Sequence, residues 1–133
     1  MQPFEGNPPS TVDGILDSRT LKQLLDLDDG ELGLTQEMCQ LFTEDMPPRI
    51  LAMEAAIKAG QGEEMGDVAH AVKGAASTMG VPGVRAVALA LETLGRTGKG
   101  VETAETLLAR MKVEYERAEG ALQAYLVSKG GRV

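Results

Sequence analysis

The sequence predicts an all-α protein, an up-down-up-down antiparallel four-helix bundle with an additional short helix at its N-terminal end. The chain has 133 residues, of which 43% are hydrophobic, so it can bury one core but is short for two independent domains. Aromatic residues are scarce, with two Phe, two Tyr and no Trp, and a core of aliphatic and Met side chains suits helix-on-helix packing. Apolar residues recur at spacings of three and four, and short connections between such segments place consecutive helices antiparallel.

The two ends of the chain differ in composition from the rest. Residues 1–14 are rich in Pro, Gly, Ser and Asn and predict a flexible arm. We expect the bundle to span residues 15–128, and residues 129–133 to form a disordered tail. The arm has no basic and apolar segments typical of an export signal, and no apolar run is long enough to span a membrane.

Polar residues and prolines delimit the first two predicted helices. Asp17 and Ser18 can cap the first helix, and the breaker Asp28-Asp29-Gly30 ends it. The second helix is expected to run from an N-cap at Thr35 to about residue 59. Because Pro47-Pro48 removes backbone donors and clashes with the preceding turn, we expect a kink or a brief break there.

Glycines and a proline delimit the next two helices. A helix over residues 63–79 should end at Gly80, which is well placed as a left-handed C-terminal cap. Pro82 suits the first turn of the following helix, which Gly95 and Gly98 are expected to end.

The last predicted helix spans residues 102–128. Its apolar residues alternate steps of four and three, which is the pattern of a helix that packs along a bundle. They are Ala104, Leu108, Met111, Tyr115, Ala118, Leu122 and Tyr125.

Charge and cysteine content argue against several classes of partner. The chain has 20 acidic and 13 basic residues, and its net charge of −7 repels nucleic acid and anionic membranes. The one cysteine, Cys39, cannot form an internal disulfide and falls at an apolar position, so we expect it in the core of a cytoplasmic protein. One core accounts for nearly all apolar residues, and we therefore expect a monomer.

The helical pattern places the one histidine, His70, toward solvent. A lone histidine is most often an ordinary core or surface residue. On a helix over residues 63–79, the apolar side chains fall within an arc of about 120°, and His70 lies about 160° from the middle of that arc. This excludes the core interpretation. An exposed imidazole near neutral pH is substantially uncharged and nucleophilic, as phosphoryl acceptance requires.

Small residues surround His70 on its face of the helix. They are Gly66, Gly74 and Ser77. Glycine inside a helix costs about 0.5–1 kcal/mol relative to alanine, so two on one face need a reason, and close approach by another protein is one. Lys73 lies three residues after His70 and could pair with oxygens of a phosphate on the ring, although a merely solvated lysine would look the same.

Residues 69–80, Ala-His-Ala-Val-Lys-Gly-Ala-Ala-Ser-Thr-Met-Gly, resemble the signature of histidine-containing phosphotransfer (HPt) domains. That signature reads His-x-Leu-Lys-Gly, followed by small residues and a later glycine, and Val72 here replaces the usual Leu. Residues 91–96, Leu-Glu-Thr-Leu-Gly-Arg, are similar to the family's Leu-Glu segment on the following helix. Residues 41–48 resemble the family's Phe-x-x-Asp-x-Pro region, and together these elements cover about residues 15–127 in the family's order.

The resemblance implies a phosphocarrier with a covalent phosphohistidine, and not an enzyme. His70 would take a phosphoryl group from a receiver-domain aspartate of a hybrid sensor kinase and pass it to the receiver of a response regulator. It implies that Lys73 assists the phosphate, that Gly74 leaves room for the ring and the partner, and that Ser77 is the small residue one turn further on. No cofactor is expected on this chain, and Mg²⁺ is expected on the partner receiver. The chain also lacks a Gly-x-x-x-x-Gly-Lys-[Ser/Thr] loop for loading itself from ATP.

Partner docking is expected around the histidine and on the neighbouring second helix. Charged side chains on such a rim can choose between partners. The expected docking residues are Gly66, Asp67 and Ala71 beside the histidine, and Glu44, Asp45 and Arg49 on the rim.

Two other functions fit the same residues. The domain could be the substrate of a separate histidine kinase that phosphorylates it directly. It could also be a helical binding module that is never phosphorylated, with His70 as an incidental contact. A metal site is not expected, because Asp67 and His70 supply at most two ligands.

Overall fold

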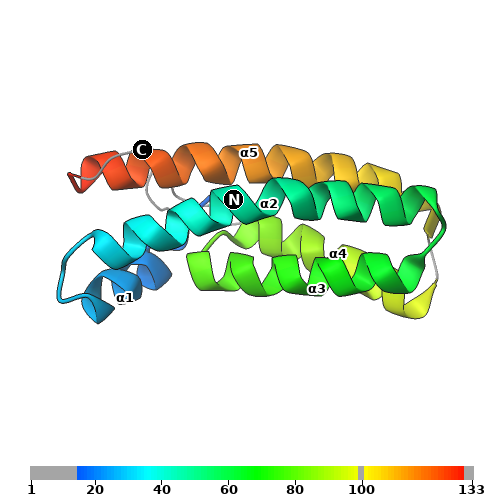
Figure 1. The fold of residues 1–133 in the computed structure, drawn as a ribbon, viewed down its shortest axis with the longest axis horizontal. Coiled ribbons are helices and arrows are strands. Elements are labelled where there is room, and N and C mark those ends of the chain that lie inside the picture. Colours follow the sequence, from blue (N-terminus) through cyan, green and yellow to red (C-terminus); the bar gives the residue numbers. More distant parts are fainter. Residues whose placement is uncertain (1–14, 99–100, 131–133) are drawn as a thin grey trace, which may run out of the picture.

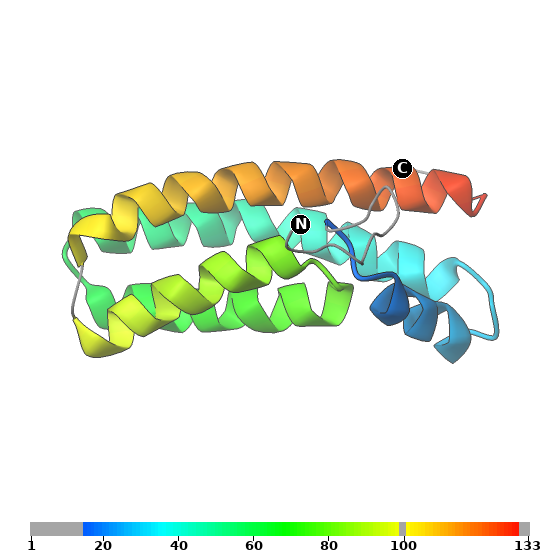
Figure 2. The ribbon, with the colours of Figure 1, turned by 180° about the vertical axis from the view of Figure 1, so that it is seen from behind.

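The computed structural model describes residues 15–98 and 101–130, and within these ranges the protein has helices and no strands. The elements are α1 (Ser18–Leu27), α2 (Gly33–Lys58), α3 (Gly62–Met79), α4 (Pro82–Thr97), the 3-10 turn η1 (Val101–Thr103) and α5 (Ala104–Ser128). The helices α2, α3, α4 and α5 run alternately in opposite directions, and α1 lies beside one end of α2 (Figures 1 and 2). The predicted bundle with its additional N-terminal helix is confirmed. The predicted arm, residues 1–14, and residues 131–133 of the predicted tail lie outside the described residues.

The core is built from aliphatic and methionine side chains, as the scarcity of aromatics predicts. The four long helices enclose it, and the most extensive packing is between α3 and α4. Cys39 is buried in this core, and burial raises the pKa of its thiol to about 11. No helix in the described part of the chain is long and apolar enough to cross a membrane. The largest fully buried side chains include Leu21, Met46, Met53, Met65, Met79, Leu91, Met111 and Leu122.

The short helix α1 is joined to the end of α3. The Asp17 carboxylate accepts a hydrogen bond from the backbone N–H of Arg19 at 3.0 Å, which confirms Asp17 as the N-cap. The backbone N–H of Asp17 donates to the carbonyl of Gly80 at 2.7 Å. Gly80 has a φ of 69° and is the left-handed C-cap of α3, as predicted. A Cβ there would lie 2.9 Å from Thr20, so the glycine also allows α1 to approach.

The predicted N-cap of the second helix is wrong. Helix α2 begins at Gly33, and Thr35 is fully buried within its first turns. The side chain of Asp28, in the preceding loop, accepts from the backbone N–H of Leu34 at 3.0 Å. The loop folds back onto the start of α2. The acceptor of the free N–H of Leu34 is therefore Asp28, six residues earlier in the chain.

The two prolines do not break α2. The helix continues through Pro47 and Pro48 as one element, although its half next to α1 is inclined to the rest in Figure 1. Pro47 has no N–H to donate to the carbonyl of Thr43, four residues earlier. The hydroxyl of Tyr115 on α5, which packs on Phe42, donates to that carbonyl at 3.2 Å. A contact between helices therefore replaces the missing bond within the helix.

Gly95 does not end α4, because the helix continues to Thr97 and has its left-handed C-cap at Gly98, with a φ of 71°. A Cβ on Gly95 would lie 2.8 Å from the Cα of Gly66 and closer still to the carbonyl oxygen of Gly62. The glycine therefore lets α3 and α4 pack backbone against backbone.

Candidate functional site

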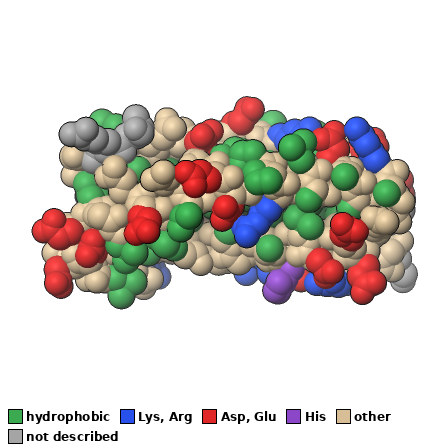
Figure 3. Space-filling view, in the orientation of Figure 1, with side chains coloured by type: hydrophobic (Ala, Val, Ile, Leu, Met, Phe, Trp, Pro, Cys, Tyr) green, Lys and Arg blue, Asp and Glu red, His purple; other side chains and the backbone are tan. Residues whose placement is uncertain are grey.

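The histidine lies on the outer face of α3, as its helical position predicts. The side chain of His70 is 63% exposed. Figure 3 shows it at the edge of the face formed by α2 and α3, next to basic side chains. The ring is therefore accessible to another protein.

Glu92 on α4 holds the ring from one side. Its Oε2 lies 2.9 Å from Nδ1 of His70, and its side chain is only 14% exposed. Several groups hold the pKa of Glu92 below its ordinary value of 4.5, first the hydrogen bond from Lys73 and then that from His70, against the opposing effect of desolvation. Glu92 is therefore an acceptor at neutral pH, and Nδ1 of a neutral His70 must be the donor. The lone pair of the ring then resides on Nε2.

Lys73 is bound to the same carboxylate. Its Nζ lies 2.7 Å from Oε1 of Glu92, so the two oxygens of Glu92 bind two different side chains of α3. Because Lys73 is one helical turn from His70, its ammonium group is held beside the ring.

Arg96 and Asp67 complete a network of four charged groups around His70. Nη1 of Arg96 lies 2.7 Å from Oδ1 of Asp67, and Nη2 lies 3.6 Å from Oε2 of Glu92. The network thus contains two carboxylates and two cations. The formal charges of these four groups sum to zero.

A groove between α2 and α3 lies beside the histidine. It has a volume of about 360 Å³, and Ala71 and Gly74 on α3 form part of its wall. On α2 the groove is lined by the exposed Leu41 and by the two predicted rim residues Asp45 and Arg49. The structure therefore brings these two rim residues together with the neighbours of His70.

Comparison with known proteins agrees with this geometry. The model of the Hpt domain family matches residues 37–124. The chain belongs to the Hpt domain family. It is similar to the crystal structure of histidine-containing phosphotransfer protein B (HptB) from Pseudomonas aeruginosa PAO1, with a TM-score of 0.77 and 25% identity, over 84% of this chain and 94% of that chain. Curated protein sequences gave no match. Membership of this family indicates a role in histidine phosphotransfer in two-component signalling.

Two small residues of the Hpt domain differ in their surroundings. A Cβ on Gly74 would have no atom outside its own helix within 4 Å, so this glycine leaves open space on the surface. The hydroxyl of Ser77 accepts a hydrogen bond from Nε of Arg85 on α4 at 2.9 Å. Ser77 therefore contacts a cation of the neighbouring helix.

Two predicted docking residues lie elsewhere. Gly66 is buried against α4 at Gly95, so its missing side chain serves helix packing, and its expected place on the docking surface is wrong. Glu44 is exposed on α2 but does not line the groove, and its carboxylate accepts from Nε2 of Gln40 at 3.1 Å.

Reasoning from the sequence missed Glu92 and Arg96 as site residues. Both lie in the segment 91–96 that resembles the family, and their spacing of four places them on one face of α4. To predict that this face of α4 lies next to His70, one must know the register between α3 and α4. That register depends on the contact of Gly66 with Gly95.

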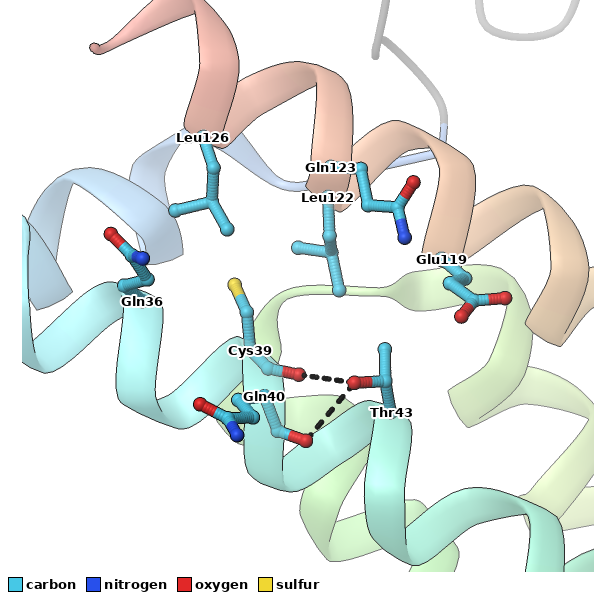
Figure 4. Close-up of a pocket in the computed structure, with 8 residues that line it drawn as sticks. All are labelled: Gln36, Cys39, Gln40, Thr43, Glu119, Leu122, Gln123 and Leu126. Atoms are coloured by element: carbon cyan, nitrogen blue, oxygen red, sulfur yellow. Dashed lines mark hydrogen bonds between the residues drawn. The ribbon is translucent and has the colours of Figure 1, made fainter. Parts of the chain in front are cut away.

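A second pocket lies between α2 and α5 and has a volume of about 290 Å³ (Figure 4). Cys39 lines it, but with a pKa of about 11 its thiol is protonated and a poor nucleophile near neutral pH. The hydroxyl of Thr43 is bonded to the backbone carbonyls of Cys39 and Gln40. Among the described residues, no group of three or more His, Cys, Asp and Glu is placed to hold a metal ion. We assign no chemistry to this pocket.

Proposed function

We propose that this Hpt domain relays a phosphoryl group through Nε2 of His70, from the receiver aspartate of a hybrid sensor kinase to that of a response regulator. The observation that carries the proposal is the 2.9 Å contact between Glu92 and Nδ1 of an exposed ring. Because the carboxylate accepts the Nδ1 proton, Nε2 keeps the lone pair that attacks phosphorus.

The proposed transfer needs no general base. The lone pair of Nε2 attacks the phosphorus of an aspartyl phosphate, the P–O bond to the aspartate breaks, and its electron pair returns to that carboxylate. His70 retains its Nδ1 proton and becomes positively charged next to Glu92. In the second transfer the next aspartate attacks phosphorus, and the electrons of the Nε2–P bond return to the ring. Both steps then depend mainly on positioning and charge neutralisation.

Lys73 is the cation best placed to accompany the phosphoryl group. Its Nζ is held 2.7 Å from Glu92 in the unphosphorylated site. A phosphoryl group adds about two negative charges beside it. We propose that the ammonium group is then shared between Glu92 and the phosphoryl oxygens, which lowers the repulsion between the two anions.

The groove between α2 and α3 is the proposed docking surface for the receivers. Leu41 offers an apolar contact, while Asp45 and Arg49 provide charges of both signs at its rim. Apolar contact contributes affinity, whereas mismatched rim charges discriminate between receivers. The magnesium ion and the acidic pocket of the reaction are proposed to belong to the receiver.

Phosphotransfer from a purified receiver tests the proposal. A receiver that carries a radiolabelled phosphoryl group is mixed with the Hpt domain, and label should move to this chain in an acid-labile, base-stable form. His70→Gln should abolish the labelling, and Lys73→Met should slow it. Lys22→Met is the matched control, because Lys22 also forms an ion pair, with Asp26, but lies on α1. Labelling retained in His70→Gln would overturn the assignment.

Two other outcomes would favour the alternative functions. Labelling of His70 by an ATP-bound kinase domain, with no receiver present, would make the chain a direct kinase substrate. Binding of receivers without any transfer of label would make it a binding module.

A further inference from the structure

Arg96 is shared unequally between two carboxylates. Its guanidinium group lies 2.7 Å from Asp67 on α3 but 3.6 Å from Glu92, one turn away on its own helix. The pair with Asp67 is therefore the shorter of the two. Glu92 is the group that binds the ring proton of His70.

We infer that Asp67 and Arg96 are positioning residues that set the negative charge presented by Glu92 to His70, and thereby the lifetime of the phosphohistidine. This inference rests on the proposed function, because it concerns the phosphorylated state of His70. Neither residue has to touch the phosphoryl group.

The physical link is the proton on Nδ1. When the ring keeps this proton, cleavage of the Nε2–P bond releases neutral imidazole, which is a far better leaving group than its anion. A carboxylate with its full charge holds the proton on the ring, whereas a carboxylate closely paired with a guanidinium group holds it less well. Asp67 draws Arg96 away from Glu92, and so keeps the phosphohistidine labile.

The other charged groups near the ring are already engaged. Lys73 on α3 pairs with the second oxygen of Glu92, and Arg85 on α4 donates to Ser77. The ion pair of Asp67 with Arg96 is thus the part of the network that can change without a direct contact to His70. An exposed ion pair has a modest coupling, so we expect effects of about two- to five-fold.

Chemical phosphorylation provides a test that needs no partner. Phosphoramidate transfers its phosphoryl group to Nε2 as its P–N bond breaks and ammonia leaves. The rate of hydrolysis of phospho-His70 is then followed over a range of pH by phosphorus NMR. Asp67→Asn should lengthen the lifetime about two- to five-fold and move the midpoint of the pH profile to lower pH, since Arg96 can close on Glu92. Arg96→Gln should shorten the lifetime and move the midpoint to higher pH.

Two further variants separate this effect from general changes of charge or folding. In the Arg96→Gln background, Asp67→Asn should have little additional effect, because Asp67 acts through Arg96. Asp26→Asn is the matched control, since Asp26 is 63% exposed and paired with Lys22 at 3.1 Å, against 65% exposed and 2.7 Å for Asp67. It should leave the lifetime unchanged.

The outcomes distinguish this inference from the proposed function. If Asp67→Asn leaves both lifetime and midpoint at their wild-type values, or has its full effect without Arg96, the inference is overturned while His70 remains the carrier. If the wild-type chain takes no labelled phosphoryl group on His70 from a phosphorylated receiver, the proposed function fails and the inference fails with it.

Discussion

Gly95 of α4 and Gly66 of α3 meet backbone against backbone, and a Cβ on Gly95 would lie 2.8 Å from the Cα of Gly66. One turn further along the two antiparallel helices, the same register brings Glu92 to 2.9 Å from His70. The glycine contact therefore sets the distance between Glu92 and the ring of His70.

Gly95→Ala should destabilise the protein and loosen the hold on the ring. The new methyl group would overlap the backbone of α3, and overpacking of this kind costs about 1–3 kcal/mol. Urea unfolding measures the loss of stability, and nitrogen NMR of His70 should show a mixture of ring tautomers. Gly120→Ala is the control, because a Cβ on Gly120 of α5 meets nothing within 4 Å outside its helix. Equal stability of the two variants would contradict the role of the glycine contact.

Gly74→Ala should change stability and function in opposite directions. No atom outside its helix lies within 4 Å of the added Cβ, so the variant should be more stable by about 0.5–1 kcal/mol through helix propensity. Transfer from a receiver should be slower, because the methyl group would occupy space in the groove that we propose as the docking surface for receivers. Rates from a phosphorylated receiver and urea unfolding test the two effects. Gly120→Ala should gain stability without slower transfer, and a Gly74→Ala variant with unchanged rates would argue against docking there.

The contribution of Glu92 to stability should depend on pH. Its hydrogen bonds from Lys73 and His70 hold its pKa in the folded protein below the ordinary value of 4.5. The stabilisation is therefore present above about pH 4.5 and is lost as the pH falls through the lowered value. The free energy of unfolding of the wild type should exceed that of Glu92→Gln near neutral pH, and this difference should shrink in acid. Urea unfolding at several pH values measures it, with Glu116→Gln on the exposed face of α5 as control. A difference that stays constant with pH would refute the prediction.

Tyr115→Phe should lower the free energy of unfolding more in the wild type than in the variant Pro47→Ala. The tyrosine hydroxyl is the donor to the carbonyl of Thr43, and leaving a partly buried carbonyl without its donor costs about 1–3 kcal/mol. Burial and the nearby Glu119 raise the pKa of Tyr115 to about 12, so the hydroxyl remains a donor near neutral pH. In Pro47→Ala, the restored N–H can donate to Thr43, and the effect of Tyr115→Phe should be smaller. A double-mutant cycle from urea unfolding measures this coupling, which should be absent if the hydroxyl acts elsewhere.

The sequence by itself determined the helices and the outward face of α3. The spacing of apolar residues is a local property, and it sufficed to place His70 toward solvent and the cysteine in the core. Caps at Asp17 and Gly80 were likewise recognisable, because their bonds reach only neighbouring turns. Local rules gave a wrong N-cap at Thr35, where Asp28 of the preceding loop accepts from the free N–H of Leu34. At the proline pair they left a kink and a break as alternatives, because Tyr115 of another helix donates the bond that α2 lacks.

Only the tertiary structure decided how the charged groups around His70 are arranged. Sliding two helices past each other by one turn leaves their apolar faces buried but changes every pair of side chains across the interface. Periodicity therefore leaves this register open. The close contact of Gly66 with Gly95 selects one register, and in it Glu92 binds the ring while Arg96 is divided between two carboxylates.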